Sequence, residues 1–361
     1  MRRLEVHTQT THYEMVIGAN LLKQISHFIA QLGLSPEGGC LIVSDDQVTA
    51  LGYPDAILTA MQQAGWPAQL AVIPAGDESK SLLQTQALYT HLLQSRVRRS
   101  GVVIAVGGGV VGDLAGFAAA TYLRGVHFVQ VPTTLLAHDS SIGGKVGVNL
   151  PEGKNLIGAF YHPRLVLYDI DTLKTLTERE WRGGMAEVIK HAIIGNPQLF
   201  SQLQTTPQPT FGEPVTVEDM IAQASAVKIA IVQSDEREAG LRMHLNLGHT
   251  VGHAIEQASH YLLNHGESVA LGLRIEAEIA VAKNWLEPVI RDQIIAVLRQ
   301  HHLPVSPPNL NWEQVVAYLE VDKKHSGKGW TFVLPREIGR VEVTREITQN
   351  DVLNAWRASI A

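Results

Sequence analysis

The sequence has very little cysteine and no long apolar run. Its single cysteine, Cys40, excludes disulfide bonds within the chain and is typical of a reducing compartment. Cys40 begins the apolar run 40–43, so we expect a buried, unreactive thiol. No apolar run is long enough to span a membrane, and polar residues follow Arg2 and Arg3, where a secretory signal would be apolar. We therefore expect a soluble cytoplasmic protein.

Charge is also sparse. Charged residues make up 18% of the chain, and the formal net charge is only −6. This mild balance argues against nucleic acid or a membrane surface as a partner. An anionic ligand therefore has to be held by a local group of basic side chains. The length of 361 residues exceeds one ordinary core and predicts two domains.

The two halves of the chain have different patterns. In the first half, short β-type runs at 40–43, 69–73, 102–106 and 127–131 alternate with helical segments such as 81–94. This predicts an α/β nucleotide-binding domain over residues 1–172, with a Rossmann-like parallel sheet covered by helices on both faces. Residues 173–361 predict a mainly α-helical domain that binds metal and substrate. Its expected helices are 178–194, 217–233, 249–260, 267–283 and 287–301.

A glycine turn follows the clearest strand. Gly107, Gly109 and Gly112 match the pattern G-x-G-x-x-G, which lets backbone N–H groups approach a pyrophosphate at a helix N-terminus. The acidic residue expected about 20 positions later is missing, because 127–134 contains no Asp or Glu. Asp45, after an earlier strand, is the alternative ribose ligand. We favour nucleotide binding over a purely structural turn because the strand context is right.

Residues 132–155 predict a functional loop. Lys145 and Lys154 lie beside glycines, where ammonium groups and backbone amides can surround a phosphate. The segment 140–145 has almost no bulk to pack, which favours function over a solvated connection. A second basic stretch, 322–329, is either a solvated turn or the source of one lysine for an anion.

The densest polar cluster lies at 242–256. His249 and His253 are four residues apart and share one face of a helix, which from spacing alone makes them the first candidate pair for a metal. Glu187, His249 and His265 form an alternative Glu-His-His set, with His253 and Glu256 as rival ligands. A polar helix face without metal also remains open. Glu187 and Lys190 are either a surface pair or a buried pair, and a buried carboxylate needs a metal or a partner.

Several motifs in order resemble the 3-dehydroquinate synthase family over nearly the whole chain. They are G-G-G-V-V-G-D-L-A-G-F, P-T-T-L-L-A-H-D-S-S-I-G-G-K, G-K-N-L-I-G-A-F, A-E-V-I-K and L-N-L-G-H-T-V-G-H-A-I-E. The resemblance implies NAD in the first domain, Zn²⁺ (or Co²⁺) in the second, and a homodimer. It implies that Glu187, His249 and His265 bind the metal, and it moves His253 to the substrate phosphate.

The resemblance also implies roles for other residues. Contacts to the substrate phosphate are implied for Lys145, Asn155, Asn246, His253 and one of Lys323 or Lys324. Arg124 would reach into the neighbouring subunit's site. Lys228 and Arg242 would bind the substrate carboxylate, with Lys190 lining the pocket. Asp139 and Lys154 would lie where nicotinamide and substrate meet. The implied NAD contacts are Asp45, Gln47, Asp77, Lys80, Gly108, Gly109, Asp113, Thr133, Thr134, Lys145, Lys154, Thr175 and Leu176.

The implied reaction is a lyase step of the shikimate pathway. A heptulosonate phosphate, 3-deoxy-D-arabino-heptulosonate 7-phosphate, would become 3-dehydroquinate and phosphate. Transient oxidation by NAD, β-elimination, reduction, ring opening and an intramolecular aldol would follow one another. The alternatives are another sugar phosphate cyclase, such as a 2-deoxy-scyllo-inosose synthase, for which the clamp of Lys228 and Arg242 has no use, and a metal-dependent alcohol dehydrogenase, which would release NADH.

Overall fold

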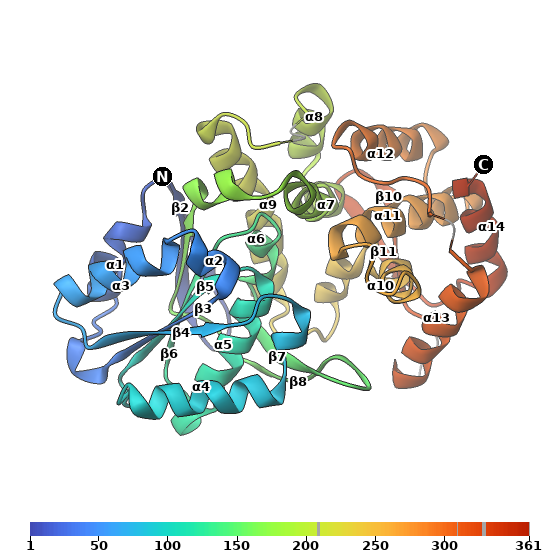
Figure 1. The fold of residues 1–361 in the computed structure, drawn as a ribbon. Coiled ribbons are helices and arrows are strands. Elements are labelled where there is room, and N and C mark those ends of the chain that lie inside the picture. The colour runs from blue at the N-terminus through green and yellow to red at the C-terminus, as the bar shows by residue number, and fades with distance from the viewer. Residues whose placement is uncertain (208–209, 309, 327–329, 361) are drawn as a thin grey trace. The chain divides into compact units, whose positions relative to one another are not determined.

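The computed structural model describes residues 1–207, 210–308, 310–326 and 330–360 (Figure 1). The chain divides into two compact units. The first comprises Met1–Leu176 with Glu213–Ala222, and the second comprises Thr177–Gly212 with Gln223–Ala361. Within the described residues, no helix has both the length and the apolar character needed to cross a membrane.

The first unit is built on a seven-stranded sheet in the order β1-β2-β9-β6-β5-β3-β4. Six strands run parallel, and β1 alone is antiparallel to its neighbour β2. The strands are β1 (Arg2–His7), β2 (His12–Gly18), β3 (Cys40–Asp45), β4 (Ala68–Ile73), β5 (Val102–Gly107), β6 (His127–Pro132) and β9 (Leu165–Asp169). The predicted α/β class with a mostly parallel sheet is therefore confirmed.

Both faces of this sheet are buried, which explains why its central strands are continuous apolar runs. Successive side chains point to opposite faces, so Cys40 and Ile42 join one core cluster, whereas Leu41 and Val43 join the other. The first cluster packs under α1 (Ile25–Gln31) and α3 (Tyr53–Gln63), and the second under α4 (Leu82–Gln94) and α5 (Gly109–Thr121). Burial raises the pKa of the Cys40 thiol, as expected for an unreactive cysteine.

The prediction of a loop over residues 132–155 is wrong for much of that range. After the short helix α6 (Ala137–Ser140), Lys145–Leu150 forms β7, which pairs with β8 (Gly153–Phe160) in an antiparallel hairpin. The sequence did not predict this pairing, because glycines interrupt the alternation of apolar and polar residues that marks a strand. A Cβ atom on Gly147 would lie 2.6 Å from the carbonyl oxygen of Ile157, and one on Gly158 would lie 2.5 Å from that of Val146. Only glycine allows the two strands to approach this closely.

The second unit is mainly helical, which confirms the fold class predicted for the second half of the chain. It contains α7 (Glu178–Gly195), α8 (Pro197–Thr205), most of α9 (Pro214–Ser234), α10 (His249–Ala258), α11 (His265–Ala282), α12 (Pro288–Gln300), α13 (Trp312–Ser326) and α14 (Gln349–Ile360). A small hairpin of β10 (Phe332–Glu337) and β11 (Arg340–Thr344) completes it. Helix α11 is buried along most of its length and packs against α7, α10, α12 and α14.

Candidate active site

The predicted glycine turn joins β5 to α5 in the first unit. Gly108 is the N-cap of α5, and no side chain caps the backbone N–H groups of the helix's first turn. A Cβ atom on Gly108 would lie 3.1 Å from Cγ2 of Thr134, and one on Gly107 would lie 2.6 Å from Cγ2 of Val111. The turn is therefore closely packed and leaves helix N–H groups available to an anion.

Asp45 and Gln47 lie where β3 meets the short helix α2 (Asp46–Ala50). The Asp45 carboxylate is the N-cap of α2 and accepts a hydrogen bond of 2.7 Å from the N–H of Val48. Burial raises the pKa of Asp45. Gln47 is exposed on the same helix. Asp45 thus fixes the local backbone by capping α2.

Three expected site residues of the first unit meet around one ammonium group. Nζ of the buried Lys80 lies 2.6 Å from Oδ2 of Asp113 and 2.5 Å from Oδ1 of Asn155. Lys80 follows β4, Asp113 lies in the first turns of α5, and Asn155 lies on β8. The ion pair therefore joins the glycine turn to the β7–β8 hairpin.

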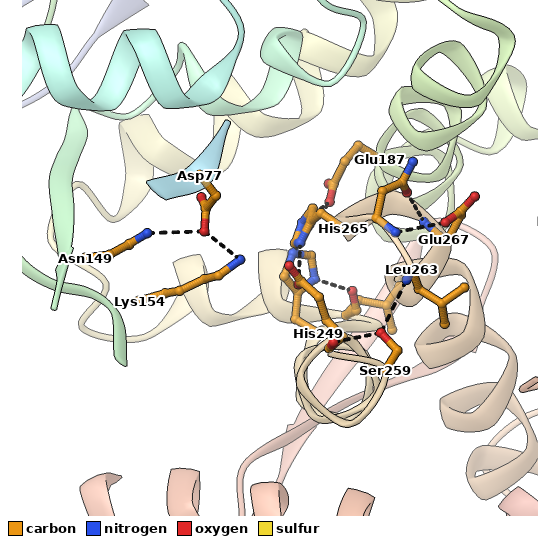
Figure 2. A network of polar contacts seen from close by, with 12 residues as sticks. Asp77, Asn149, Lys154, Glu187, His249, Ser259, Leu263, His265 and Glu267 are labelled. Carbon is orange, nitrogen blue, oxygen red and sulfur yellow. Dashed lines mark hydrogen bonds and ion pairs between the residues drawn. The ribbon is translucent and has the colours of Figure 1, made fainter. Parts of the chain in front are cut away.

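A second polar contact holds the same hairpin to the segment after β4 (Figure 2). Nζ of Lys154 lies 3.0 Å from Oδ2 of Asp77, and the Asn149 amide donates to the same oxygen at 3.3 Å. The Asn149 side chain in turn accepts the N–H of Asn155 at 3.0 Å. Asn149 was missed by sequence reasoning, although its polar side chain sits between the two lysine-bearing segments.

The remaining expected residues of the first unit are dispersed over its loops. Thr133 is buried after β6, and the Thr134 hydroxyl accepts the N–H of Ala137 at 3.3 Å. Thr175 bonds through its hydroxyl to that of Tyr53 at 3.0 Å, and Leu176 ends the first segment of the unit. Half-buried Asp139 lies on α6, exposed Lys145 begins β7, and exposed Arg124 follows α5.

In the second unit, three helices bring Glu187, His249 and His265 together (Figure 2). Glu187 lies on α7, whereas His249 and His265 are the first residues of α10 and α11. Oε1 of Glu187 is 3.5 Å from Nε2 of His249 and 3.4 Å from Nε2 of His265. Ligand atoms about 2.1 Å from a tetrahedral ion are about 3.4 Å from one another. The spacing therefore fits a divalent metal.

The outer nitrogens of both imidazoles already have partners. Nδ1 of His249 donates to the carbonyl of Leu247 at 3.0 Å, and Nδ1 of His265 bonds to the Glu256 carboxylate at 3.3 Å. Because a carbonyl can only accept, neutral His249 carries its proton on Nδ1, and the lone pair of Nε2 is directed at the Glu187 oxygen. Two electron-rich atoms facing each other call for a cation between them. Glu256, which the sequence offered as a rival ligand, here orients His265.

A second possible donor set, His253, Glu256 and His265, shares His265 with the first. His253 is exposed and lies one turn after His249, and their rings are 5.2 Å apart. Glu187, by contrast, is almost completely buried. Lys190 pairs with Oε2 of this carboxylate, whereas Oε1 is the atom that both imidazoles approach, so the first set fits a metal better.

The electrostatics around the three ligands are polarised. Burial and the charge of Lys190 lower the pKa of His249 well below its ordinary range. Burial also opposes the charge of His265, but the carboxylates of Glu187 and Glu256 outweigh this effect and raise its pKa to about 9. Nζ of Lys190 lies 2.5 Å from the other oxygen of Glu187. The two carboxylates of Glu187 and Glu256 therefore favour a positive charge at the position of His265.

Glycines allow the helices that carry these ligands to pack closely. A Cβ atom on Gly266 would lie 2.0 Å from the carbonyl oxygen of Gly183 in α7, and one on Gly272 would lie 1.9 Å from that of Gly248. A larger residue at Gly266 would push α7 away, and one at Gly272 would push the start of α10 away. The donor atoms on these helices would then separate.

Glu276, which sequence reasoning missed, fixes the start of α10. It is completely buried on α11, and its carboxylate accepts the N–H of Gly248 at 2.5 Å. Gly248 is the N-cap of α10, has a φ of 78°, and offers no side chain for capping. Glu276 thus supplies the cap from another helix. Its signal in the sequence is weak, because the segment 269–280 also carries Arg274 and Glu278.

Basic side chains are buried nearby in the second unit. Lys190, Lys228 and Arg242 are each at most 7% exposed, which is rare for cations unless they serve an anion or a partner. The guanidinium of Arg242 donates to the carbonyl of Glu236 at 2.5 Å, and the backbone N–H of Arg242 donates to the Asp235 carboxylate at 2.9 Å. Asn246 is exposed at the end of the short 3-10 helix Leu241–Asn246, which also carries Arg242. Lys323 and Lys324 lie on α13, with side chains outside the described part of the structure.

Comparison with known proteins identifies relatives over nearly the full length. A family profile described as 3-dehydroquinate synthase N-terminal matches residues 70–183, and one described as 3-dehydroquinate synthase C-terminal matches residues 184–325. The 3-dehydroquinate synthase of Nostoc punctiforme is 42% identical over 350 residues, which cover 95% of this chain and 96% of the relative.

Solved structures share the fold of the whole chain. ValA, a 2-epi-5-epi-valiolone synthase from Streptomyces hygroscopicus subsp. jinggangensis with NAD⁺ and Zn²⁺ bound, matches with a TM-score of 0.87 and 28% identity over 98% of each chain. A 2-deoxy-scyllo-inosose synthase complexed with carbaglucose-6-phosphate, NAD⁺ and Co²⁺ matches with a TM-score of 0.89 and 24% identity over 99% of each chain. At this identity the second likeness shows the fold alone.

Proposed function

The chain belongs to the 3-dehydroquinate synthase family, and we propose that it converts 3-deoxy-D-arabino-heptulosonate 7-phosphate to 3-dehydroquinate and phosphate, as a lyase of the shikimate pathway. The observation that best supports this chemistry is that Glu187, His249 and His265 each place one possible ligand atom within 4.8 Å of the other two. These donors suit Zn²⁺ or Co²⁺, which when bound lowers the pKa of a hydroxyl that it contacts.

NAD is the proposed second cofactor, and it supplies the hydride acceptor and donor. The glycine turn before α5 supports this assignment, because Gly108 leaves backbone N–H groups at the helix start open to a pyrophosphate. The Lys80 ammonium contacts both Asp113, which follows that turn on α5, and Asn155, and thereby fixes their positions relative to each other. We assign the adenosine and pyrophosphate side of NAD to Asp45, Gln47, Asp77, Lys80, Gly108, Gly109, Asp113, Thr133, Thr134, Thr175 and Leu176, with Lys145, Lys154 and Asp139 nearer the reacting end.

The buried cations provide the proposed contacts to the acidic substrate. Lys228 and Arg242 would bind its carboxylate, and Lys190, beside Glu187, would line the same pocket. Arg242 suits this role because the carbonyl of Glu236 and the carboxylate of Asp235 fix its position in advance. A sugar phosphate without a carboxylate would leave two buried charges without a substrate partner.

The phosphate group would be bound by Lys145, Asn155, Asn246, His253 and one of Lys323 or Lys324. These side chains can hold a leaving phosphate by charge and hydrogen bonds. Because the phosphate is itself a base, it can accept the proton that is lost in the elimination. These donors then need only to orient the phosphate.

We also propose a homodimer in which Arg124 reaches the neighbouring subunit's site. Leu123 and Arg124 have φ angles of 51° and 66°, a left-handed conformation that is costly for residues other than glycine. Such strain in an exposed arginine supports a functional position. Mixed dimers of two inactive variants, one lacking Arg124 and one lacking Lys228, should regain part of the activity. Inactive mixed dimers would exclude sharing.

The deciding assay incubates the protein with the heptulosonate phosphate, zinc and a catalytic amount of NAD. We expect inorganic phosphate to accumulate without net NADH, because oxidation is reversed within each turnover. Accumulating NADH would instead identify an alcohol dehydrogenase, and turnover of a sugar phosphate without a carboxylate would identify another cyclase. Glu187→Ala and His265→Ala should lose both bound zinc and activity, and zinc retained at full occupancy would overturn the ligand assignment.

A further inference from the structure

The turn end of the β1–β2 hairpin carries a second cluster of side chains that can bind a metal, in the first unit. The two strands pair Glu5 with Glu14 and His7 with His12. Glu5 and His7 lie two residues apart on β1 and therefore share one face. Glu5, His7 and His12 are all exposed, so the cluster has no role in the core.

The three side chains converge closely. The rings of His7 and His12 stack, with centroids 4.2 Å apart and planes 3° from parallel. Nε2 of His12 contacts Oε2 of Glu5, and Nε2 of His7 lies 3.9 Å from the same oxygen. One ligand atom from each residue lies within 4.8 Å of the others. Two imidazole nitrogens are thus directed at one carboxylate oxygen.

We propose that Glu5, His7 and His12 form a second divalent-metal site, separate in sequence and in fold unit from Glu187, His249 and His265. Its donors are the same as in that first set: two imidazoles and one carboxylate. Imidazole-rich sites select zinc, nickel or copper over magnesium and calcium. Because both rings are exposed, they can tilt from their stack until both Nε2 lone pairs point at one ion. The remaining coordination positions are open to water.

The backbone holds this site in place before a metal binds. The turn is closed by the N–H of Thr8, which donates to the carbonyl of Thr11 at 2.9 Å. The Thr8 hydroxyl accepts the N–H of Thr11 at 3.1 Å. Behind the turn, Val6 and Tyr13 are buried and anchor both strands. A cross-strand pair fixed in this way loses little entropy when it binds an ion.

Nearby charge also favours a cation. Glu14, which pairs with Glu5 across the strands, forms an ion pair of 2.9 Å with Arg3. Two carboxylates and one guanidinium therefore lie on the same face of the hairpin as the imidazoles, and their formal charges sum to a negative value. The His12–Glu5 contact can alternatively be a surface ion pair without a metal, which is worth little. The experiment below separates these two cases.

The test counts zinc on untagged, full-length protein by equilibrium dialysis and elemental analysis. The double variant His7→Ala/His12→Ala should hold one zinc fewer per chain than the parent, with unchanged turnover. His27→Ala, which removes another exposed histidine of the same unit, should leave the zinc count unchanged. Equal zinc counts in parent and double variant would overturn the proposal.

A second measurement does not depend on the zinc held elsewhere in the chain. Untagged parent protein should be retained on an immobilised nickel column, and the double variant should elute earlier. Glu5→Gln should weaken nickel binding by about tenfold or more, because it removes the anionic ligand. Retention that is equal for parent, Glu5→Gln and the double variant would show that other surface histidines bind the column.

Discussion

The carboxylate of Glu276 accepts a hydrogen bond of 2.5 Å from the backbone N–H of Gly248, one residue before the proposed ligand His249. A completely buried acid thereby caps the helix that begins with His249. This contact links the interior of α11 to the position of an imidazole in the candidate metal site.

Replacing Glu276 should change how stability depends on pH. Burial raises the pKa of Glu276 well above its ordinary range. Its contribution to stability is therefore full below the unfolded-state pKa and is lost as pH rises through the folded-state pKa. Relative to Glu276→Gln, the parent should become less stable as pH rises from 5 to 8, by about 1.4 kcal/mol per unit of pKa difference realised in that range. Urea unfolding of both proteins measures this, and a constant difference would contradict it.

Removing the cap should loosen metal binding. Glu276→Ala leaves the N–H of Gly248 without its partner and should cost about 1–3 kcal/mol of folding free energy. Because His249 follows directly, zinc affinity should also fall, as measured by competition with a chelator. Glu276→Gln keeps a side-chain oxygen in place and should recover most of the affinity. Equal zinc affinity in the parent, Glu276→Ala and Glu276→Gln would show that the cap does not affect metal binding.

Glu256→Gln should weaken zinc binding without unfolding the protein. The Glu256 carboxylate holds Nδ1 of His265 at 3.3 Å and thereby orients Nε2 toward Glu187. Loss of such an outer partner typically costs about 10–100-fold in metal affinity. Glu342→Gln, which changes an exposed carboxylate on β11, is the matched control. An affinity loss as large in the control would point to a general charge effect.

Lys80→Met should impair NAD binding more than a surface lysine change. The buried ammonium of Lys80 holds Asp113 and Asn155 together, and its loss leaves the Asp113 carboxylate without its ion-pair partner. The Kd for NAD should rise by about tenfold or more, since breaking a buried pair costs several kcal/mol. Lys174→Met removes an exposed partner of Asp171 and should leave the Kd unchanged. Calorimetric titration with NAD compares the two.

Gly272→Ala should be severely destabilising because the new methyl group would lie 1.9 Å from the carbonyl oxygen of Gly248. Overpacking of this kind costs about 1–3 kcal/mol or more when backbone atoms must move. Gly240→Ala is the control, since no neighbouring atom lies within 4 Å of its Cβ position. Thermal melting should show a lower Tm for Gly272→Ala alone. Equal Tm values would mean that α10 and α11 can separate without cost.

The sequence by itself determined the strands at 40–43, 102–106 and 127–131, because buried parallel strands are continuous apolar runs. It also identified the strand at 69–73, which is partly exposed at the edge of the sheet. It also determined the helices at 178–194, 217–233, 249–260, 267–283 and 287–301, and the family, whose long motifs occur in order, but it did not include α8, α13 and α14. It missed the β1–β2 and β7–β8 hairpins, in which polar side chains or glycines mask the apolar alternation.

Only the tertiary structure decided how donors far apart in the chain meet. Spacing along one helix favoured His249 with His253, but the packing of α7, α10 and α11 directs Nε2 of His249 and of His265 at Glu187. It likewise assigned Glu256 to orienting an imidazole and Glu276 to capping a helix. A sequence records which groups can bind a metal or cap a helix, whereas close glycine contacts between helices determine which of those groups come within reach.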